Sequence, residues 1–285
     1  MKVYADNAAT TYLNDVALNT LLDCLKNYNG NPNSLHTDGQ VAQEKLDESR
    51  AKVAEAINAA KPNEIYFTSG GSEADNQALI SAARGLVKKG KKHLISLNIE
   101  HHAILHTLAK LEKEGFEVTL LKPQPNGIVD VKDVENAIRE DTALVSIMFA
   151  NNEMGAIQPI AEIGKLCHDK RVLFHTDAVQ AVAHLPIDVQ AMNIDMLSMS
   201  AHKFHGPKGV GALYARNGIR LINVIEGGAQ ERGKRAGTVN VPGNAALAAA
   251  LEDGVLHMEE NARKTAALRD RLIKGLSDIP YSQLN

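Results

Sequence analysis

From about residue 60 the chain alternates short apolar runs, rich in β-branched and aromatic residues, with longer segments of helical period. Strands that alternate with helices in this way build a mainly parallel sheet with helices on both faces. Only a glycine-rich turn separates the last two runs, which is too short for a parallel crossover, so the seventh strand should be antiparallel. We therefore expect an α/β fold with a mainly parallel seven-stranded sheet. The expected strands are 64–68, 93–97, 117–121, 143–149, 172–175, 196–199 and 210–214, and the clearest helices are 72–87, 101–114 and 160–170.

The charge distribution indicates the class of partner, and the cysteine content indicates the cellular compartment. Among 285 residues there are 31 Lys and Arg and 34 Asp and Glu, mixed along the chain rather than gathered in blocks. This pattern suggests neither nucleic acid nor an anionic membrane as a partner, so we expect a small-molecule ligand. The N-terminus lacks the apolar core of a signal peptide, and no run reaches the roughly 18 apolar residues of a membrane helix. Two cysteines are too few for a disulfide framework, which favours a cytoplasmic protein.

Polar residues follow five of the expected strands. In open sheets of this type, ligands bind at the carboxyl ends of the strands, so these residues are candidates for one binding site. We expect the five loops to meet on one rim of the sheet. The residues are Gly70-Gly71-Ser72, Glu100-His101, Asn151-Asn152, Asp177 with Gln180, and Ser200-His202-Lys203.

A glycine pair, Gly70 and Gly71, lies between an expected strand and an expected helix. The free N–H groups and the positive dipole end of a helix bind anions, and glycine lets a phosphate approach closely. A capped helix explains the same residues without a ligand, with Ser72 and Asp75 as the capping box. The dinucleotide fingerprint GxGxxG and the P-loop GxxxxGK[ST] are both missing from this stretch, so a phosphate site and a simple helix cap both stay open.

Two ionisable residues follow later strands. Asp177 lies just beyond a buried strand end, where a carboxylate needs a partner such as a protonated pyridine nitrogen, although it also suits a helix N-cap. Gln180 lies about one helical turn further on, within reach of a ring substituent. A desolvated Lys203 would have a lowered pKa and a neutral amine able to form a Schiff base, whereas a loop lysine is usually solvated. A phosphate cradle, an acidic partner for a pyridinium and a lysine together predict a pyridoxal phosphate site.

Six motifs surround these residues in sequence order: "FTSGGSEADN", "EHHAIL", "ANNEMGAIQPI", "HTDAVQA", "SAHKFHGPKGVGALY" and "ERGKRAGTVNV". Together with the opening "YADNAATT", they resemble the cysteine desulfurases of the NifS/IscS type, in the class V aminotransferase group of fold-type I pyridoxal phosphate enzymes. The resemblance extends to about residue 250. It implies an enzyme that converts L-cysteine to L-alanine. It also implies transfer of the sulfur as a persulfide to an acceptor or scaffold protein, for iron–sulfur cluster or thiocofactor assembly.

The resemblance assigns a role to each residue on the expected rim. Lys203 would hold the cofactor, and Asp177 would pair with its pyridine nitrogen. His101 would stack on the ring and assist proton transfer, while Gln180 and Asn152 would contact the ring oxygen and the substrate side. One phosphate contact would come from the neighbouring subunit, which implies a homodimer. The implied phosphate-binding residues are Gly71, Ser72, Ser200, His202 and, from the neighbouring subunit, Thr238.

The histidines and one turn carry weaker indications of their own. His101 would open a helix, where a structural role fits as well as ring stacking. A metal site at His202 and His205 is disfavoured because no third ligand of suitable spacing follows. The stretch Asn31–His36 resembles a family loop near the substrate entrance, but by sequence alone it is only a turn.

The cysteines and the last residues depart from the family pattern. The family's persulfide-forming cysteine, and the arginine that binds the substrate carboxylate, would both lie beyond position 285. Cys24 and Cys167 lie among apolar residues of expected helices and should be buried structural thiols. We expect a fragment of a longer enzyme, which binds pyridoxal phosphate but does not form a persulfide by itself. Its expected parts are an N-terminal segment packing with the small domain (1–14), a large cofactor-binding domain (15–250), and a linking helix with an incomplete small C-terminal domain (251–285).

Three other functions stay open on the sequence. A selenocysteine lyase or another class V aminotransferase shares the cofactor site, and the substrate groups beyond the large domain would distinguish it. A non-catalytic scaffold that binds pyridoxal phosphate and docks on a sulfur acceptor is a second alternative. A dinucleotide or sugar-nucleotide enzyme is disfavoured because no fingerprint follows the first strand.

Overall fold

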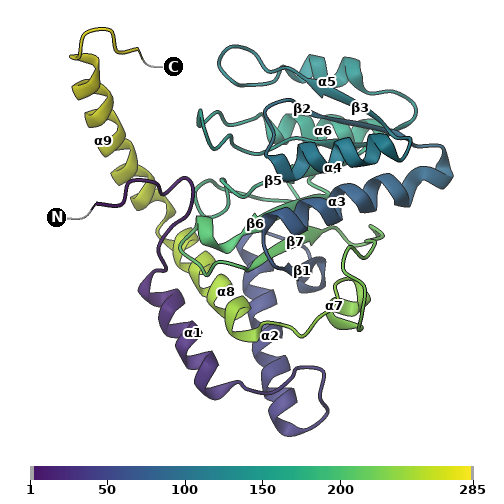
Figure 1. Ribbon diagram of the computed structural model, residues 1–285, viewed down its shortest axis with the longest axis vertical. Coiled ribbons are helices and arrows are strands. Elements are labelled where there is room, and N and C mark those ends of the chain that lie inside the picture. The colour runs from purple at the N-terminus through teal and green to yellow at the C-terminus, as the bar shows by residue number, and fades with distance from the viewer. Residues whose placement is uncertain (1–2, 284–285) are drawn as a thin grey trace.

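One seven-stranded sheet organises the part of the chain that the computed structural model describes, residues 3–283 (Figure 1). Its strands are β1 (Ile65–Thr68), β2 (His93–Leu97), β3 (Glu117–Leu121), β4 (Thr142–Ser146), β5 (Leu173–Asp177), β6 (Met196–Ser200) and β7 (Gly211–Ala215). The order across the sheet is β1-β7-β6-β5-β4-β2-β3. Strand β7 runs antiparallel to both of its neighbours, and the other pairs are parallel. The predicted mainly parallel sheet with an antiparallel seventh strand is confirmed.

Two hydrophobic cores lie on opposite faces of the sheet because successive side chains of a strand point to opposite sides. In β2, Leu94 packs in one core, and Ile95 and Leu97 pack in the other. The Leu94 face is covered by α3 (Gly71–Leu86) and α4 (His102–Lys113). The predicted helices on both faces are therefore confirmed. The helices on the other face are α1 (Asp15–Asn27), α2 (Thr37–Ala56), α5 (Val131–Ala137), α6 (Ile160–Lys170) and α8 (Val241–Leu256).

The expected element boundaries agree with the observed ones to within one or two residues, except at β4. This strand was expected to continue to residue 149 but ends at Ser146. Beyond it, the N–H of Ile147 still donates to His175 O at 3.1 Å, and the N–H of Phe149 donates to Asp177 O at 2.8 Å. The chain therefore stays bonded to β5 after the regular strand has ended, and it reaches the strand ends as a loop.

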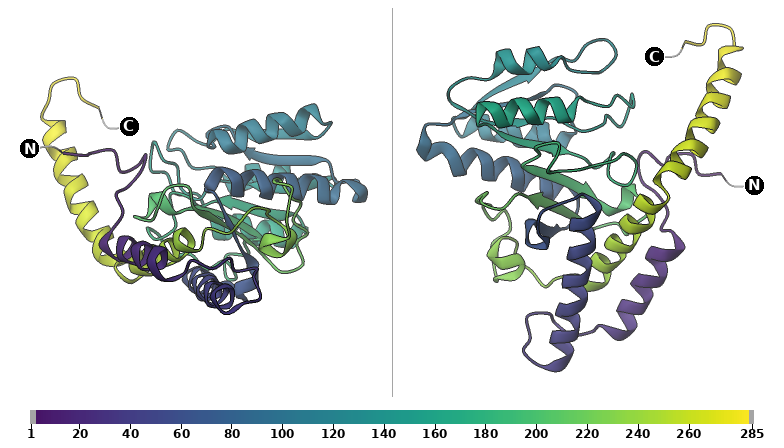
Figure 2. Two further views of the ribbon diagram at one scale, coloured as in Figure 1. Left: turned by 60° about the horizontal axis from the view of Figure 1, so that its bottom comes forward. Right: turned by 180° about the vertical axis from the view of Figure 1, so that it is seen from behind.

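The helix α9 (Met258–Ser277) follows α8 and projects away from the layers around the sheet (Figures 1 and 2). None of its residues, all of which the structure describes, is buried, and several leucines along it are exposed. The ends of the two outer expected domains, residues 1–2 and 284–285, lie outside the described residues. Within residues 3–283, no helix is both long and apolar enough to cross a membrane.

Candidate functional site

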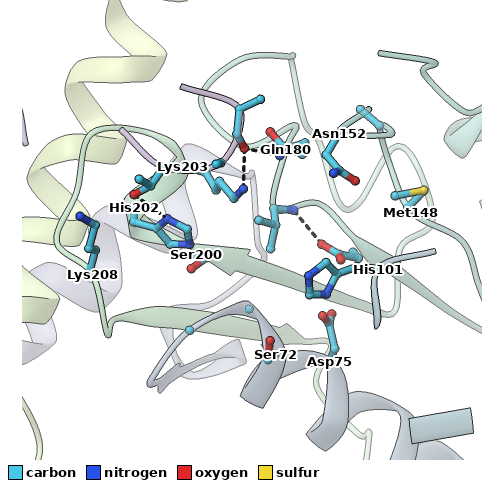
Figure 3. Close-up of a pocket in the computed structure, with 18 of the residues that line it drawn as sticks. Ser72, Asp75, His101, Met148, Asn152, Gln180, Ser200, His202, Lys203 and Lys208 are labelled. Atoms are coloured by element: carbon cyan, nitrogen blue, oxygen red, sulfur yellow. Dashed lines mark hydrogen bonds between the residues drawn. The ribbon is translucent and has the colours of Figure 1, made fainter. Parts of the chain in front are cut away.

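A cavity of about 670 Å³ opens at the carboxyl ends of the strands, where the sequence placed a binding rim (Figure 3). This volume is typical of sites for small molecules and cofactors. The expected convergence of five strand-end loops is confirmed. Thr238, which the family resemblance assigned to a neighbouring subunit's site, is exposed and does not line the cavity of its own chain. The predicted residues that line the cavity are Gly71, Ser72, His101, Asn152, Asp177, Gln180, Ser200, His202 and Lys203.

The first turn of α3 forms one end of the cavity. Gly70 is the N-cap of this helix, so the alternative of a capping box with Ser72 and Asp75 is wrong. Instead, the N–H of Ser69 donates to the carboxylate of Glu73 at 2.8 Å, which leaves Ser72 free to line the cavity. The first N–H groups of a helix have no partner within the helix and attract anions. Three polar side chains gather at the same end, as Figure 3 shows: Ser200, His202 and Lys208.

The turn before α3 depends on a backbone conformation that only glycine adopts easily. Gly70 has a φ of 151° and a ψ of −178°. A Cβ at this position would meet Ser200 Oγ at 3.6 Å, so the backbone angle, rather than space, limits a substitution. We expect Gly70→Ala to shift the first turn of α3 and to weaken pyridoxal phosphate binding by roughly tenfold or more, as the cost of such strain is about 1–3 kcal/mol. An absorbance titration of the cofactor-free chain measures this.

The matched control for that prediction is Gly85→Ala, within the same helix. Gly85 has ordinary helical geometry, and a Cβ there would meet its nearest neighbour, Arg220 O, at 3.9 Å. This variant should bind the cofactor as the native chain does and should be slightly more stable, since alanine favours a helix over glycine. Equal binding by the Gly70 and Gly85 variants would contradict the proposed role of the turn.

Lys203 lies at the end of a 3₁₀ turn, Ala201–Lys203, that directly follows β6. Its amine donates to the carbonyl oxygen of Ala8 at 2.6 Å, and the Nε2 of Gln180 donates to the same oxygen at 3.0 Å (Figure 3). Partial burial lowers the pKa of Lys203, while the nearby carboxylates of Asp177 and Asp6, and more weakly Glu153, oppose this shift. The lysine therefore lies in the cavity with its pKa below that of a solvated lysine, in the direction that the sequence predicted.

The N-terminal segment forms a wall of the cavity that sequence reasoning did not predict. Thr11 fixes it to the lysine turn, since its N–H and its hydroxyl donate to His202 O at 2.9 and 2.8 Å. His202 Nδ1 also lies 3.1 Å from the hydroxyl of Thr10. No spacing rule connects residues about 190 positions apart, so the motif "YADNAATT" was the only signal for this wall. The residues of the segment that line the cavity are Asp6, Ala8, Ala9 and Thr10.

Asp177 lies at the end of β5 and is buried. Its Oδ1 accepts the N–H of Val179 at 3.0 Å, and the residue also lines the cavity. The alternative of a helix N-cap is wrong, because only turns lie between β5 and β6. Burial raises the pKa of Asp177, and the Val179 N–H, His101 and Lys203 partly offset this effect. A second carboxyl group, that of Asp75 on α3, also lines the cavity, and the sequence pattern had suggested only a helix cap for it.

His101 and Asn152 also line the cavity, and His101 lies beside Asp75 of α3 (Figure 3). His101 is the N-cap of α4, and its Nδ1 accepts the N–H of Ala103 at 3.1 Å. His101 therefore has the structural role that the sequence allowed, as a helix cap, and it lines the cavity as well. Asn152 is exposed, and its amide donates to the carboxylate of Glu153 at 2.7 Å.

The residues around the cavity suit pyridoxal phosphate in three respects. Glycine makes the cradle at the α3 terminus, where a Cβ on Gly71 would lie 2.6 Å from Val179 Cγ2. The buried Oδ1 of Asp75 has no hydrogen-bond partner within residues 3–283, which leaves a polar atom for a ligand or a proton to satisfy. An amine and an anion site, at Lys203 and the first turn of α3, share the same cavity. The chemistry of this donor set matches an aldehyde that also carries a phosphate and a basic ring nitrogen.

Several other expected features lie away from the cavity. Cys24 and Cys167 are buried, as expected, and burial raises the pKa of Cys167 to about 12. His205 Nδ1 lies 2.9 Å from Tyr12 O. The turn Asn31–His36, expected near a substrate entrance, joins α1 to α2 and does not line the cavity of this chain. His36 instead caps α2.

Comparison with known proteins gives matches along the whole chain. Residues 3–285 match the family model described as aminotransferase class-V. The cysteine desulfurase IscS of Clostridium botulinum is 53% identical over 285 residues, which cover 100% of this chain and 71% of that protein. A solved NifS-like protein has a TM-score of 0.94 at 41% identity, covering 98% of this chain and 76% of its own. A structure described as SspA in complex with cysteine has a TM-score of 0.84 at 40% identity, covering 88% of this chain and 72% of its own.

Proposed function

Because the chain belongs to the class V aminotransferases and, among them, to the pyridoxal phosphate-dependent cysteine desulfurases, we propose that its cavity removes the sulfur atom from L-cysteine and releases L-alanine. The convergence of Lys203, Asp177 and the α3 terminus on one cavity is the observation that carries this proposal. The cysteine bound in the similar SspA structure supports the choice of substrate. The IscS names of the relatives support iron–sulfur cluster assembly as the destination of the sulfur.

The cofactor would be held at its two ends by different elements. Pyridoxal phosphate, when bound, supplies an aldehyde that condenses with amines and a ring that accepts electrons from the α-carbon of an amino acid. In this proposal Asp177 pairs with the ring nitrogen, while Gln180 and Asn152 contact the ring oxygen and the substrate. The residues proposed to hold the phosphate are Gly71, Ser72, Ser200 and His202.

Lys203 and His101 are the proposed proton carriers of the site. Burial lowers the pKa of Lys203, so a larger share of its side chain is the unprotonated amine that attacks a carbonyl. The Nδ1 of His101 accepts a backbone N–H, so the proton of the neutral ring resides on Nε2. We therefore assign proton exchange at His101 to Nε2.

We also propose that two copies of the chain form a homodimer, with Thr238 of one subunit contacting the phosphate in the other. The exposed position of Thr238, outside the cavity of its own chain, supports this arrangement. A dimer in sedimentation analysis, with cofactor binding weakened by Thr238→Ala, is the expected result.

Neither cysteine of the chain suits the role of sulfur acceptor. Cys24 and Cys167 are both fully buried, and neither lines the cavity. A thiol that accepts sulfur acts as an exposed thiolate, whereas burial raises the pKa of both thiols. We propose that the sulfur passes to a cysteine other than these two, such as one on an acceptor protein.

That proposal predicts no persulfide on this chain. After incubation of the cofactor-loaded chain with L-cysteine, mass spectrometry of alkylated peptides should show Cys24 and Cys167 unmodified. A double variant, Cys24→Ser with Cys167→Ala, should bind the cofactor as the native chain does. Persulfide on either residue, or sulfide released from L-cysteine by the isolated chain, would contradict the proposal.

A spectroscopic titration tests the function itself. L-Cysteine should change the visible absorbance of the cofactor-loaded chain, whereas D-cysteine should not. Absence of any change with L-cysteine would favour the non-catalytic scaffold. Formation of a 2-oxo acid would favour an aminotransferase, and alanine formed from selenocysteine alone would favour a selenocysteine lyase.

A further inference from the structure

A second buried carboxyl group accompanies Asp177 in the cavity and has no role in the function proposed above. Asp75, on α3, is 1% exposed and lines the cavity. Its Oδ1 has no hydrogen-bond partner in the part of the chain that the structure describes. A buried carboxylate without a partner is costly, so either its charge is compensated or the group is neutral.

The side chains around Asp75 do not supply a positive charge. His175 Nε2 lies 3.7 Å from Asp75 Oδ1, but burial lowers the pKa of His175 to about 3, so the ring is neutral. The ring nitrogens of His175 instead contact two serine hydroxyls, Ser146 Oγ at 2.9 Å and Ser198 Oγ at 3.0 Å. Because His175 and Asp177 are two residues apart on β5, they lie on the same face of the sheet, beneath α3.

The nearby charges favour a proton on Asp75 rather than on Asp177. Burial raises the pKa of Asp75 most, and the carboxyl groups of Asp177 and Glu100 raise it further, while the hydroxyl of Ser198 partly offsets the rise. Asp177 differs because it accepts a backbone N–H and is attracted by His101 and Lys203. Two neighbouring buried carboxyl groups do not both ionise easily, so one of them keeps a proton. The titratable groups that face the pair are His175 from β5, Glu100 after β2, His101 before α4 and Lys203 after β6.

We propose that Asp75 is a positioning residue that stays protonated, so that the buried pair carries one negative charge, on Asp177, for the ring nitrogen of the cofactor. This inference rests on the proposed role of Asp177. A protonated Asp75 also has a hydrogen to donate within the pair or to Ser198, which fixes the orientation of the Asp177 carboxylate. Two carboxylates would instead place an excess charge beside a cofactor that brings one positive nitrogen.

The first test measures the stability of the cofactor-free chain against pH. A carboxyl whose pKa is raised by folding binds more protons in the folded than in the unfolded chain, so stability falls as the pH rises toward the folded pKa. Asp75→Asn removes this titration. Between the unfolded and the folded pKa of Asp75, the melting temperature of the variant relative to that of the native chain should therefore rise by about 3 °C for each pH unit. The matched control, Asp141→Asn, replaces a partly exposed aspartate whose pKa Arg139 lowers, and it should show no such gain above pH 5.

The second test measures cofactor binding. Asp75→Asn, which stays neutral as the protonated acid does, should bind pyridoxal phosphate within about twofold of the native chain, with the same absorbance from pH 6 to 9. Asp75→Ala removes the hydrogen-bond donor and should shift the pH profile of that absorbance, and the Asn variant should restore it. Asp177→Asn should weaken binding by about tenfold or more.

Distinct results separate this inference from the proposed function. A roughly tenfold loss of cofactor affinity in Asp75→Asn, or parallel melting curves of Asp75→Asn and the native chain against pH, would overturn the protonated Asp75. Failure of the native chain to bind pyridoxal phosphate would overturn the proposed function. The melting-temperature comparison would still decide the protonation of Asp75 in that case, because it uses no cofactor.

Discussion

Lys203→Ala should retain no covalently bound cofactor after incubation with pyridoxal phosphate and reduction with borohydride, whereas the native chain should retain about one equivalent. The Lys203 amine lies inside the cavity, is partly buried, and has a pKa lowered by that burial. Alanine leaves the phosphate end of the site intact, so reversible binding should persist while the covalent attachment is lost. Mass spectrometry of the intact chain and of its peptides measures both.

Two control variants show whether the adduct depends on the Lys203 amine itself. One keeps the positive charge at position 203, and the other removes a lysine elsewhere in the chain. Lys203→Arg keeps the positive charge, but a guanidinium does not lose its proton at neutral pH, so this variant should also lack the reduced adduct. Lys165→Ala removes an exposed lysine on α6 that pairs with Asp169, and it should be labelled as the native chain is. A reduced adduct on another lysine, such as Lys208, in the Lys203→Ala chain would contradict the assignment.

The largest effect on stability should come from one buried ion pair. Arg50 on α2 and Glu231 are each 6% exposed and form two parallel contacts of 2.7 Å. They also bond the outer edge of β1, because Arg50 donates to Ile65 O at 2.7 Å and Glu231 accepts the N–H of Phe67 at 2.9 Å. Strand β1 ends the sheet, so these two side chains take the place of a neighbouring strand.

Breaking the pair from one side should cost about 3–5 kcal/mol of unfolding free energy, because the other charge is left buried without a partner. We expect Arg50→Met and Glu231→Gln each to lower the melting temperature by about 10 °C. Glu231 also has a φ of 46°, which is unusual for a residue other than glycine, and the pair helps to hold that backbone. Denaturant unfolding with circular dichroism measures the free energies.

The matched control is Lys52, which is on the same helix as Arg50 and forms an exposed pair with Glu252 of α8. The two side chains of this pair are 34% and 59% exposed, and Lys52→Met should cost no more than about 1 kcal/mol. In the double variant Arg50→Met with Glu231→Gln, the loss should be smaller than the sum of the single losses, because neither substitution leaves a lone charge. Strict additivity would show that the two residues act independently.

The predicted boundaries of helices and strands match the structure where the hydrophobic pattern and the residues that end an element agree. Helix α6 begins and ends at the expected residues, Ile160 and Lys170, because its apolar spacing stops at a strand signal and Arg171 ends it with a φ of 56°. The capping interpretation of the start of α3 was wrong although Ser72 and Asp75 satisfy the local capping pattern. In the structure Glu73 instead accepts the N–H of Ser69, four residues before it, and the guanidinium of the distant Arg235, while Asp75 lines the cavity.

By itself, the sequence determined the succession of strands and helices along the chain, the rim of polar residues after the strands, and the lysine and aspartate that we propose hold the cofactor there. These follow from the period of the side chains and from the rule that parallel strands end on one edge, both of which are local. Only the tertiary structure decided that Ala8 bonds Lys203, that Asp75 accompanies Asp177, and that Arg50 and Glu231 close the edge of β1. Each of these contacts joins residues about 100 or more positions apart, and burial, which sets their charges, exists only once the layers have packed.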